Sequence, residues 1–221
     1  MTAHTIEDNK QYWDDFYREF QKYIPSQFCV SVITDMPKDA VIVELGSGNG
    51  RDSLYFASQG FTTVALDLSA VAVEACQDHS KAQGLEAAHF VQADITDDKA
   101  VEHAVAKARA KSPSGALVFY SRFVMHSLDE AQQQLFLQSL SSCSHPEDVI
   151  YFEFRSTGDG NLEKHFGGHY RRYVNTSEFE DDLANIAGFH VTYAITGQGM
   201  AKYKEEDPIV SRIVAAKKRR S

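Results

Sequence analysis

Short apolar runs alternate with amphipathic segments along most of this chain. The runs cover residues 41–45, 62–67, 88–94, 115–121, 148–155, 188–195 and 209–216. Between them, residues 51–59, 70–83, 97–110 and 129–143, and a segment that Thr176 or Ser177 can cap, repeat with a helical period. Short runs of this kind are typical of buried parallel strands. The alternation predicts an α/β fold, a doubly wound sheet with helices on both faces.

The first 37 residues follow a different pattern. Aromatic residues recur at helical spacing between residues 7 and 23 (Tyr12, Trp13, Phe16, Tyr17, Phe20 and Tyr23). Such a helix either packs on the sheet or also covers a ligand cleft as a lid, and the sequence leaves both readings open. Ser26 can cap a second helix that runs to about Met36. Two further segments, 156–174 and 197–208, are predicted to be long loops, which are often functional in compact domains.

A glycine turn ends the first predicted strand. Residues 41–50 read Val-Ile-Val-Glu-Leu-Gly-Ser-Gly-Asn-Gly, and a helical segment follows. The glycine spacing is one residue shorter than the G-x-G-x-x-G pattern of dinucleotide-binding proteins. Glu44 would repel a pyrophosphate there and attract an ammonium and a sulfonium. The turn therefore favours S-adenosylmethionine (SAM) over NAD or FAD.

Two further acids end the next predicted strands. Asp67 lies about twenty residues beyond the glycine turn, where a carboxylate reaches the ribose hydroxyls of an adenosine ligand. The alternative is that Asp67 caps the following helix, but Ser69 can take that place. Asp94 ends the third strand and is followed by Ile95. Three consecutive strands thus end in an acid, which strengthens the SAM interpretation.

These motifs resemble motif I and its companion acids in the class I SAM-dependent methyltransferases. The resemblance covers residues 38–218 and implies a seven-stranded sheet of order 3-2-1-4-5-7-6 with the last strand antiparallel. It divides the chain into an N-terminal helical lid, 1–37, and a methyltransferase domain, 38–221. The implied cofactor-binding residues are Glu44, Gly46, Ser47, Gly48, Gly50, Arg51, Asp67, Leu68, Ser69, Asp94, Ile95 and Tyr120. Asp94 and Ile95 would hold the adenine.

Three short stretches resemble a narrower group, the bacterial methyltransferases that modify surface polysaccharides and small molecules. They are Pro25-Ser-Gln-Phe28, Tyr120-Ser-Arg-Phe123 and His169-Tyr-Arg-Arg-Tyr173. Tellurite-resistance-type methyltransferases are similar more distantly. The Asn/Asp-Pro-Pro-Tyr/Phe signature of enzymes that methylate DNA bases and protein glutamines is missing, which disfavours a nucleic-acid base as the acceptor.

Methyl transfer requires alignment of donor and acceptor, and a base where the acceptor is a poor nucleophile. His126, just past the fourth strand, is the first candidate base, and His169 is the second. A structural, hydrogen-bonded histidine is the alternative for each. His165 and His169 are four residues apart, but the two glycines between them argue against a helix that would present both as zinc ligands, and the reaction requires no metal.

Positive charge gathers on the expected ligand side of this acidic protein. Arg122, Arg155, Arg171 and Arg172 all follow strand ends or lie in the long loop 156–174. Surface ion pairs are one explanation, and recognition of a carboxylate or phosphate is the other. We therefore expect a small anionic acceptor, such as a sugar or glycan precursor. The expected acceptor-binding residues are Tyr17, Arg122, Arg155, His169, Tyr170, Arg171 and Arg172, with Arg122 also beside the methyl group.

Composition limits the remaining possibilities. The net charge of -9 argues against nucleic acid as the general partner. No apolar run reaches the length of a membrane span, and Cys29, Cys76 and Cys143 suggest free, buried thiols in a reducing cytoplasm. The competing readings are a non-catalytic SAM-binding module and a nucleotide-dependent oxidoreductase. The sequence leaves open the identity of the acceptor, O- or N-methylation, the use of a base, and whether the protein is a homo-oligomer.

Overall fold

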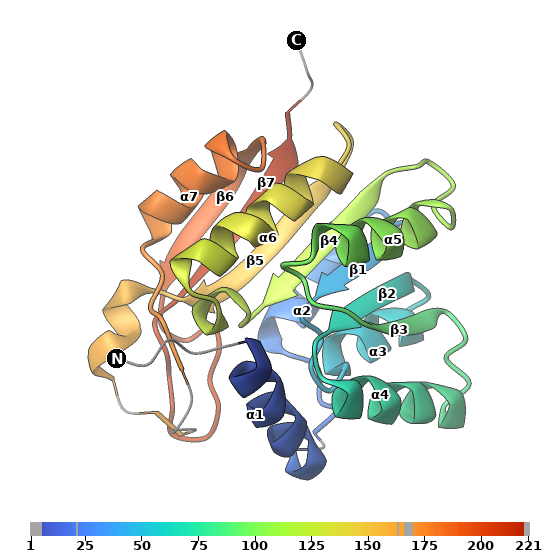
Figure 1. Ribbon diagram of the computed structural model, residues 1–221, viewed down its shortest axis with the longest axis horizontal. Helices are drawn as coiled ribbons and strands as arrows, with labels where there is room; N and C mark the ends of the chain where they lie inside the picture. Colours follow the sequence, from blue (N-terminus) through green and yellow to red (C-terminus); the bar gives the residue numbers. More distant parts are fainter. Residues whose placement is uncertain (1–5, 21, 163, 166–169, 219–221) are drawn as a thin grey trace.

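The computed structural model describes residues 6–20, 22–162, 164–165 and 170–218. Its centre is a seven-stranded sheet in the order β3-β2-β1-β4-β5-β7-β6 (Figure 1). The strands are β1 (Val41–Leu45), β2 (Thr62–Asp67), β3 (Ala88–Gln92), β4 (Leu117–Arg122), β5 (Val149–Arg155), β6 (Phe189–Gly197) and β7 (Val210–Lys217). Strands β1 to β5 pair in parallel, whereas β7 runs antiparallel to both β5 and β6. The predicted order and the reversed last strand are both confirmed.

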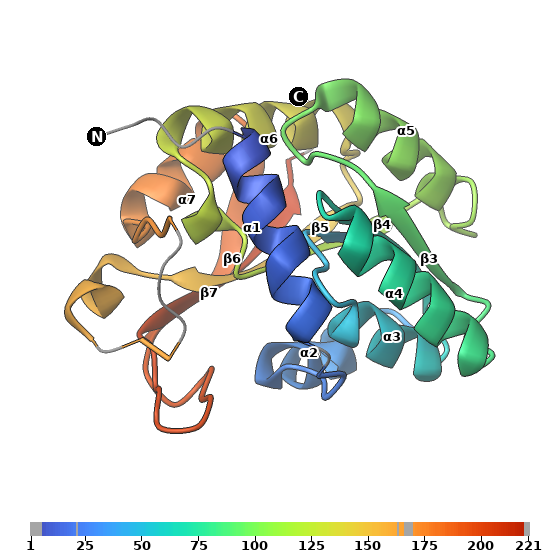
Figure 2. The same ribbon diagram turned by 60° about the horizontal axis from the view of Figure 1, so that its bottom comes forward.

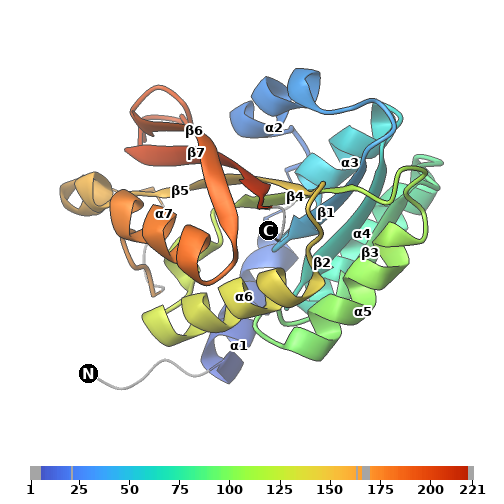
Figure 3. The ribbon, with the colours of Figure 1, turned by 90° about the horizontal axis from the view of Figure 1, so that it is seen from above.

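Helices cover both faces of the sheet. They are α1 (Ile6–Glu19), α2 (Gln27–Val32), α3 (Arg51–Ser58), α4 (Ala70–Ala82), α5 (Asp98–Arg109), α6 (Glu130–Cys143) and α7 (Thr176–Asn185). Helices α2, α3 and α4 pack on one face, and α5, α6 and α7 pack on the other (Figure 3). Helix α1 belongs to neither layer, because it crosses one end of the sheet (Figure 2).

Strand β1 shows why an apolar run forms the centre of this sheet. All five of its residues are buried. Val41, Val43 and Leu45 point into the large core under α5 and α6, and Ile42 packs with α2 and α3 on the other face. Burying each such side chain contributes about 1.5–3 kcal/mol. Glu44 alternates with Val43 and Leu45, so its carboxylate lies on the α3 side, beside the N-terminus of that helix.

Polar caps fix most helix starts at the predicted places. The Ser26 side chain accepts from the backbone N–H of Cys29 at 3.0 Å and caps α2, and Ser69 accepts from Ala72 at 3.1 Å and caps α4. The predicted cap of α7 is wrong. Asn175 takes that position, because its Oδ1 accepts from the backbone N–H groups of Ser177 and Glu178.

The two N-terminal helices end earlier than predicted. Helix α1 ends at Glu19 instead of residue 23, and α2 ends at Val32, where a 3-10 turn over Ile33–Asp35 replaces its last turn. Pro25 disfavours helical backbone at Ile24, so α1 cannot continue into α2.

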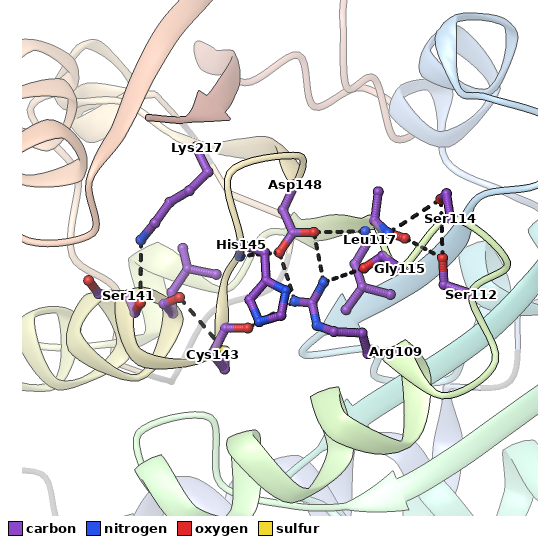
Figure 4. Close-up of polar contacts among 12 residues, drawn as sticks. Arg109, Ser112, Ser114, Gly115, Leu117, Ser141, Cys143, His145, Asp148 and Lys217 are labelled. Atoms are coloured by element: carbon purple, nitrogen blue, oxygen red, sulfur yellow. Dashed lines mark hydrogen bonds and ion pairs between the residues drawn. The ribbon is translucent and has the colours of Figure 1, made fainter. Parts of the chain in front are cut away.

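A buried ion pair ties the amino ends of the strands together (Figure 4). Arg109, at the end of α5, donates to both carboxylate oxygens of Asp148 at 3.0 and 2.8 Å, and the Asp148 side chain is fully buried. The same carboxylate accepts from the backbone N–H groups of Leu117 and His145. Four elements therefore meet at one acid, at the amino ends of the parallel strands.

Candidate functional site

A cleft of about 520 Å³ opens at the carboxyl ends of the parallel strands. Its floor is the glycine turn after β1, and its sides come from the ends of β2, β3 and β4. Helix α1 crosses in front of these strand ends (Figure 2). Parts of the segments 156–174 and 198–209 complete the rim. Sheet order reverses between β1 and β4, and ligands of α/β sheets bind at such a switch point.

The glycines of the turn serve two different purposes. Gly48 has a φ of +54°, and a Cβ built on it would lie 2.2 Å from the hydroxyl of Tyr17. A side chain here would therefore fill the cleft. Gly50, with a φ of +68°, does not line the cleft; its Cβ would lie 2.6 Å from Cys76 Sγ and 2.7 Å from the ring of Phe90. Gly50 is thus required by packing against α4 and β3.

The three predicted acids all line the cleft. Glu44 is buried and accepts a hydrogen bond from Ser53 Oγ. Burial, followed by the nearby Asp52 carboxylate, raises the pKa of Glu44 well above its usual value. A buried carboxylate of this kind would be stabilised in its ionised form by a positively charged ligand.

Asp67 and Asp94 keep acceptor positions for a ligand. Asp67 accepts from the backbone N–H of Gly48 at 2.6 Å and of Ser69 at 2.9 Å. Burial raises its pKa although these bonds favour the charged form. Both hydrogen bonds that Asp94 accepts, from the N–H and the hydroxyl of Thr96, go to Oδ1. A carboxylate has about four acceptor positions, so each of the two acids can still accept from a ligand.

Asp52 is a cleft residue that the sequence did not reveal. It follows Arg51 in the first turn of α3, where an acid is unremarkable. In the structure it is buried and accepts from Ser26 N and Oγ at 2.7 Å each, and from the Tyr120 hydroxyl at 2.8 Å. These partners are 26 and 68 positions away along the chain, so no local pattern predicts the contacts.

Three arginines present positive charge to the cleft: Arg51, Arg122 and Arg171. Arg51 makes no hydrogen bond or ion pair with the described part of the chain, and burial together with the Arg122 charge lowers its pKa. Arg122 is held by its Nε, which donates to Glu153 Oε1 at 2.8 Å. Its Nη atoms make no hydrogen bond with the described residues, so they can donate to a ligand.

The other predicted arginines have different environments. Arg155 lines the cleft, but its guanidinium is paired with Asp159 at 2.7 Å and with Glu206 at 2.5 Å. Arg172 lies outside the cleft wall and donates to the carbonyl of Leu128 at 3.0 Å. Both guanidinium groups stabilise loop segments through these contacts. For Arg155 the contacts are ion pairs, which is one of the two explanations that the sequence left open. A contact with the acceptor stays a prediction for each.

His126 lines the cleft just after β4, as predicted. It is buried, and its ring lies 5.3 Å from that of Phe123 in an edge-on arrangement. Its carbonyl accepts from the backbone N–H of Arg172 at 2.8 Å, which ties the β4 loop to the segment 156–174. Tyr170 does not line the cleft, and His169 lies outside the described residues.

Helix α1 is attached to the rim of the cleft. Ser69 Oγ donates to Asp14 Oδ1 at 2.5 Å, and the Tyr17 hydroxyl lies over Gly48. Burial, with Asp67 next, raises the pKa of Tyr17 well above its usual value. Tyr17 therefore lies beside the predicted cofactor residues, although we expected it among those that bind the acceptor.

Two predicted cofactor residues are behind the cleft wall. Ser69 is fully buried, where it caps α4 and binds Asp14. Tyr120 is also fully buried and donates to Asp52. Neither lines the cleft, and both instead hold its walls.

The described residues fit SAM. The Ser47 Oγ is buried at the cleft without a hydrogen-bond partner among them, and Gly48 leaves the space that a side chain would fill. Glu44 suits the cationic end of the cofactor, whereas Asp67, Leu68, Asp94 and Ile95 line the end predicted for adenosine.

Three other features bear on the predictions from composition. No cluster of three or more potential metal ligands occurs in the part of the chain that the structure describes. None of the described helices is long and apolar enough to cross a membrane. Cys29, Cys76 and Cys143 are free and buried, as predicted.

Comparisons with known proteins agree with this geometry. Residues 42–147 match the family model of the methyltransferase domain. No curated protein sequence matches the chain. Similar solved structures include a SAM-dependent methyltransferase from Anabaena variabilis, with 17% identity, a TM-score of 0.72, and coverage of 98% of this chain and 96% of that one.

Two further solved structures share the fold. A TehB-like SAM-dependent methyltransferase from Corynebacterium glutamicum has 16% identity, a TM-score of 0.60, and coverage of 96% and 97%. The 1,6-didemethyltoxoflavin-N1-methyltransferase of Burkholderia thailandensis has 16% identity, a TM-score of 0.67, and coverage of 99% and 92%. The sheet order, the match over residues 42–147 and the acid-lined glycine cleft lead to one conclusion: residues 42–147 form the core of a methyltransferase domain with the class I SAM-dependent fold.

Proposed function

We propose that this methyltransferase transfers the methyl group of SAM to a small anionic acceptor. The observation that supports the proposal is the placement of Arg51, Arg122 and Arg171 on the wall of one cleft in a chain of net charge -9. Arg51 makes no ion pair with the described residues, and burying a guanidinium group is costly unless an anion compensates it. Arginine also binds carboxylates and phosphates through two parallel hydrogen bonds.

The residues of the chain have separate tasks in this proposal. Glu44, Asp67 and Asp94 hold the cofactor along the strand ends, and Arg122 and Arg171 orient the acceptor. When bound, the cofactor supplies an electrophilic methyl carbon, and its sulfur keeps the electron pair of the broken bond. His126 accepts the proton that the acceptor heteroatom loses. Helix α1 closes the cleft and excludes water, which is the lid role expected for residues 1–37.

Several narrower expectations stay predictions. A sugar or glycan precursor as acceptor and a cytoplasmic location rest on the sequence alone. The match to the methyltransferase family model supports neither of the two competing readings, the oxidoreductase and the non-catalytic SAM-binding module.

A search for methylated products tests the proposal. The purified protein and SAM are added to a cell extract, and mass spectrometry searches for a small molecule that gains one methyl group. One portion of the extract is first treated with phosphatase, which removes acceptors whose anion is a phosphate ester. We expect an anionic product and formation of S-adenosylhomocysteine (SAH).

Two variants connect that product to the cleft. Arg122→Gln and Arg171→Gln should each raise the KM for the acceptor by ten-fold or more, because a hydrogen bond to a charged group contributes about 1.5–3 kcal/mol. Arg18→Gln is the control, since Arg18 is exposed on α1 and does not line the cleft. Full activity of both cleft variants, or an uncharged acceptor, would remove the anionic part of the proposal.

A further inference from the structure

Aromatic rings reach the cleft from two directions. Helix α1 contributes the half-buried rings of Tyr12, Trp13, Phe16 and Tyr17; Phe20 follows its last residue, and Phe123 follows β4. Three of the rings form a continuous series, with Tyr12 and Phe16 stacked at 6.2 Å and Phe16 and Phe20 at 5.0 Å. All of these rings line the cleft. Such surface gains most from a ligand with a flat apolar face.

Phe123 is held in the cleft at a cost in backbone energy. Its φ is +57°, in the left-handed region that a bulky side chain rarely adopts. Its backbone N–H donates to the carbonyl of Glu153 at 2.8 Å, which fixes this conformation. Strain of this kind costs about 1–3 kcal/mol and is found mainly at functional sites. Glycine would relieve this strain, so the protein keeps a side chain at this position in spite of its cost.

The ring of Phe123 lies among the groups expected to handle the acceptor. The guanidinium carbon of Arg122 is 4.0 Å from its centroid, and that of Arg155 is 5.3 Å away. The His126 ring is 5.3 Å away, edge-on. An aromatic surface is thus placed directly beside a positive charge and a candidate base. A ligand that matches it carries a ring, an anionic group and a reactive heteroatom close together.

Two carboxylates of the cleft, those of Asp52 and Glu206, already accept hydrogen bonds from the chain, which leaves fewer acceptors for sugar hydroxyls. Asp52 accepts from Ser26 and Tyr120. Glu206 accepts from Arg155 at 2.5 Å and from the backbone N–H of His165 at 3.0 Å. Sugar hydroxyls need several directional partners, and their burial without them is costly.

The geometry points to an aromatic acid as the acceptor: a flat ring that bears a carboxylate and, next to it on the ring, the hydroxyl or nitrogen that is methylated. This inference rests on the proposed function and narrows its substrate class. The carboxylate binds at Arg122, the ring lies against Phe123 and the rings of α1, and the heteroatom faces His126.

Calorimetry with matched probes tests the class directly. With SAH at saturation, the protein is titrated with hydroxybenzoates, the corresponding hydroxycyclohexanecarboxylates, the hydroxybenzamides and glucose 6-phosphate. The second set keeps the charge but loses the flat ring, and the third keeps the ring but loses the charge. We expect at least one hydroxybenzoate to bind ten-fold or more tightly than its two matched analogues and than glucose 6-phosphate.

Two variants test which residue is responsible for the preference for the ring and which for the preference for the charge. Phe123→Leu should abolish the preference for the aromatic acid over the saturated acid. Arg122→Gln should abolish the preference for the acid over the amide. Each variant should retain SAH binding. Tyr193→Leu is the control, because this exposed tyrosine of β6 lies outside the cleft.

The outcomes separate this inference from the function on which it rests. Tighter binding of glucose 6-phosphate, equal affinity for ring and saturated acid, no binding of any hydroxybenzoate, or an unchanged ring preference in Phe123→Leu each overturn the aromatic acceptor. In all four cases, SAH binding and a methylated non-aromatic anion would leave the proposed function intact. A protein that does not bind SAH contradicts both.

Discussion

Glu44 combines two properties that conflict in the protein without ligand. It is buried at the end of a central strand, and burial raises its pKa, as does the neighbouring Asp52. Its hydrogen bond from Ser53 favours the charged form but does not offset burial. A cationic ligand supplies what is missing, since an opposite charge at short range stabilises the carboxylate. Ligand charge and proton occupancy at Glu44 are therefore linked.

The pH dependence of SAM binding follows from this linkage. The pKa of Glu44 is raised in the free protein and falls when the cationic cofactor binds, so binding releases a proton. Affinity should therefore rise with pH through the interval between the two pKa values and level off above the higher one. Calorimetry in two buffers of different ionisation enthalpy measures the released proton.

Replacement of Glu44 isolates its contribution. Glu44→Gln keeps the shape and should weaken SAM binding by roughly ten- to hundred-fold, the equivalent of about 1.5–3 kcal/mol. It should also remove the pH dependence of affinity. Glu86→Gln, on an exposed residue before β3, should change neither. Unchanged affinity in Glu44→Gln would remove the argument that separated SAM from NAD.

At the level of elements, local and distant contacts differ in how well the sequence predicts them. The strands were predictable because a continuous apolar run has one good place, between two layers of helices. The caps at Ser26 and Ser69 were predictable because their partners lie three residues away. The contacts of Asp52 and the ion pairs of Arg155 depend on residues brought together by the fold. Their places in the site needed the structure.

Asp14 is a polar anchor of helix α1. Its carboxylate joins α1 to the cap of α4 through Ser69. Asp14→Ala should increase hydrogen exchange in residues 6–19 and weaken SAM binding several-fold, because an intramolecular hydrogen bond contributes about 0.5–1.5 kcal/mol. Saturation with SAM should restore part of the protection.

Asp15 provides the matched control for this experiment. It is the next residue along α1, is exposed, and among the described residues bonds only with Gln11 and Arg18 of the same helix. Asp15→Ala should leave exchange in the helix and SAM affinity nearly unchanged. Equal exchange in the two variants would show that the contact with Ser69 does not anchor α1.

Across the whole molecule, the binding cleft and the buried ion pair of Arg109 and Asp148 lie at opposite ends of the parallel strands. The cleft lies at the carboxyl ends of the strands, whereas Arg109 and Asp148 join α5, α6, β4 and β5 at the amino ends (Figure 4). Removal of one partner from a buried ion pair leaves an uncompensated charge and unsatisfied N–H groups, which costs about 3–5 kcal/mol. Because these two ends are far apart, a substitution at the amino ends can lower the stability of the protein without altering the cleft.

Asp148→Asn tests that separation. It keeps the volume of the side chain but removes the charge that Arg109 requires, so the melting temperature should fall by roughly 6–20 °C for a chain of this size. SAM affinity measured well below the transition should stay within about two-fold of the wild type. Glu147→Gln changes the preceding, exposed acid and should alter neither quantity. A large loss of SAM affinity in folded Asp148→Asn would mean that the cleft and the amino ends of the strands are coupled through the sheet. A small change in melting temperature would instead show that Leu117, His145 and Arg109 find other partners when the charge is removed.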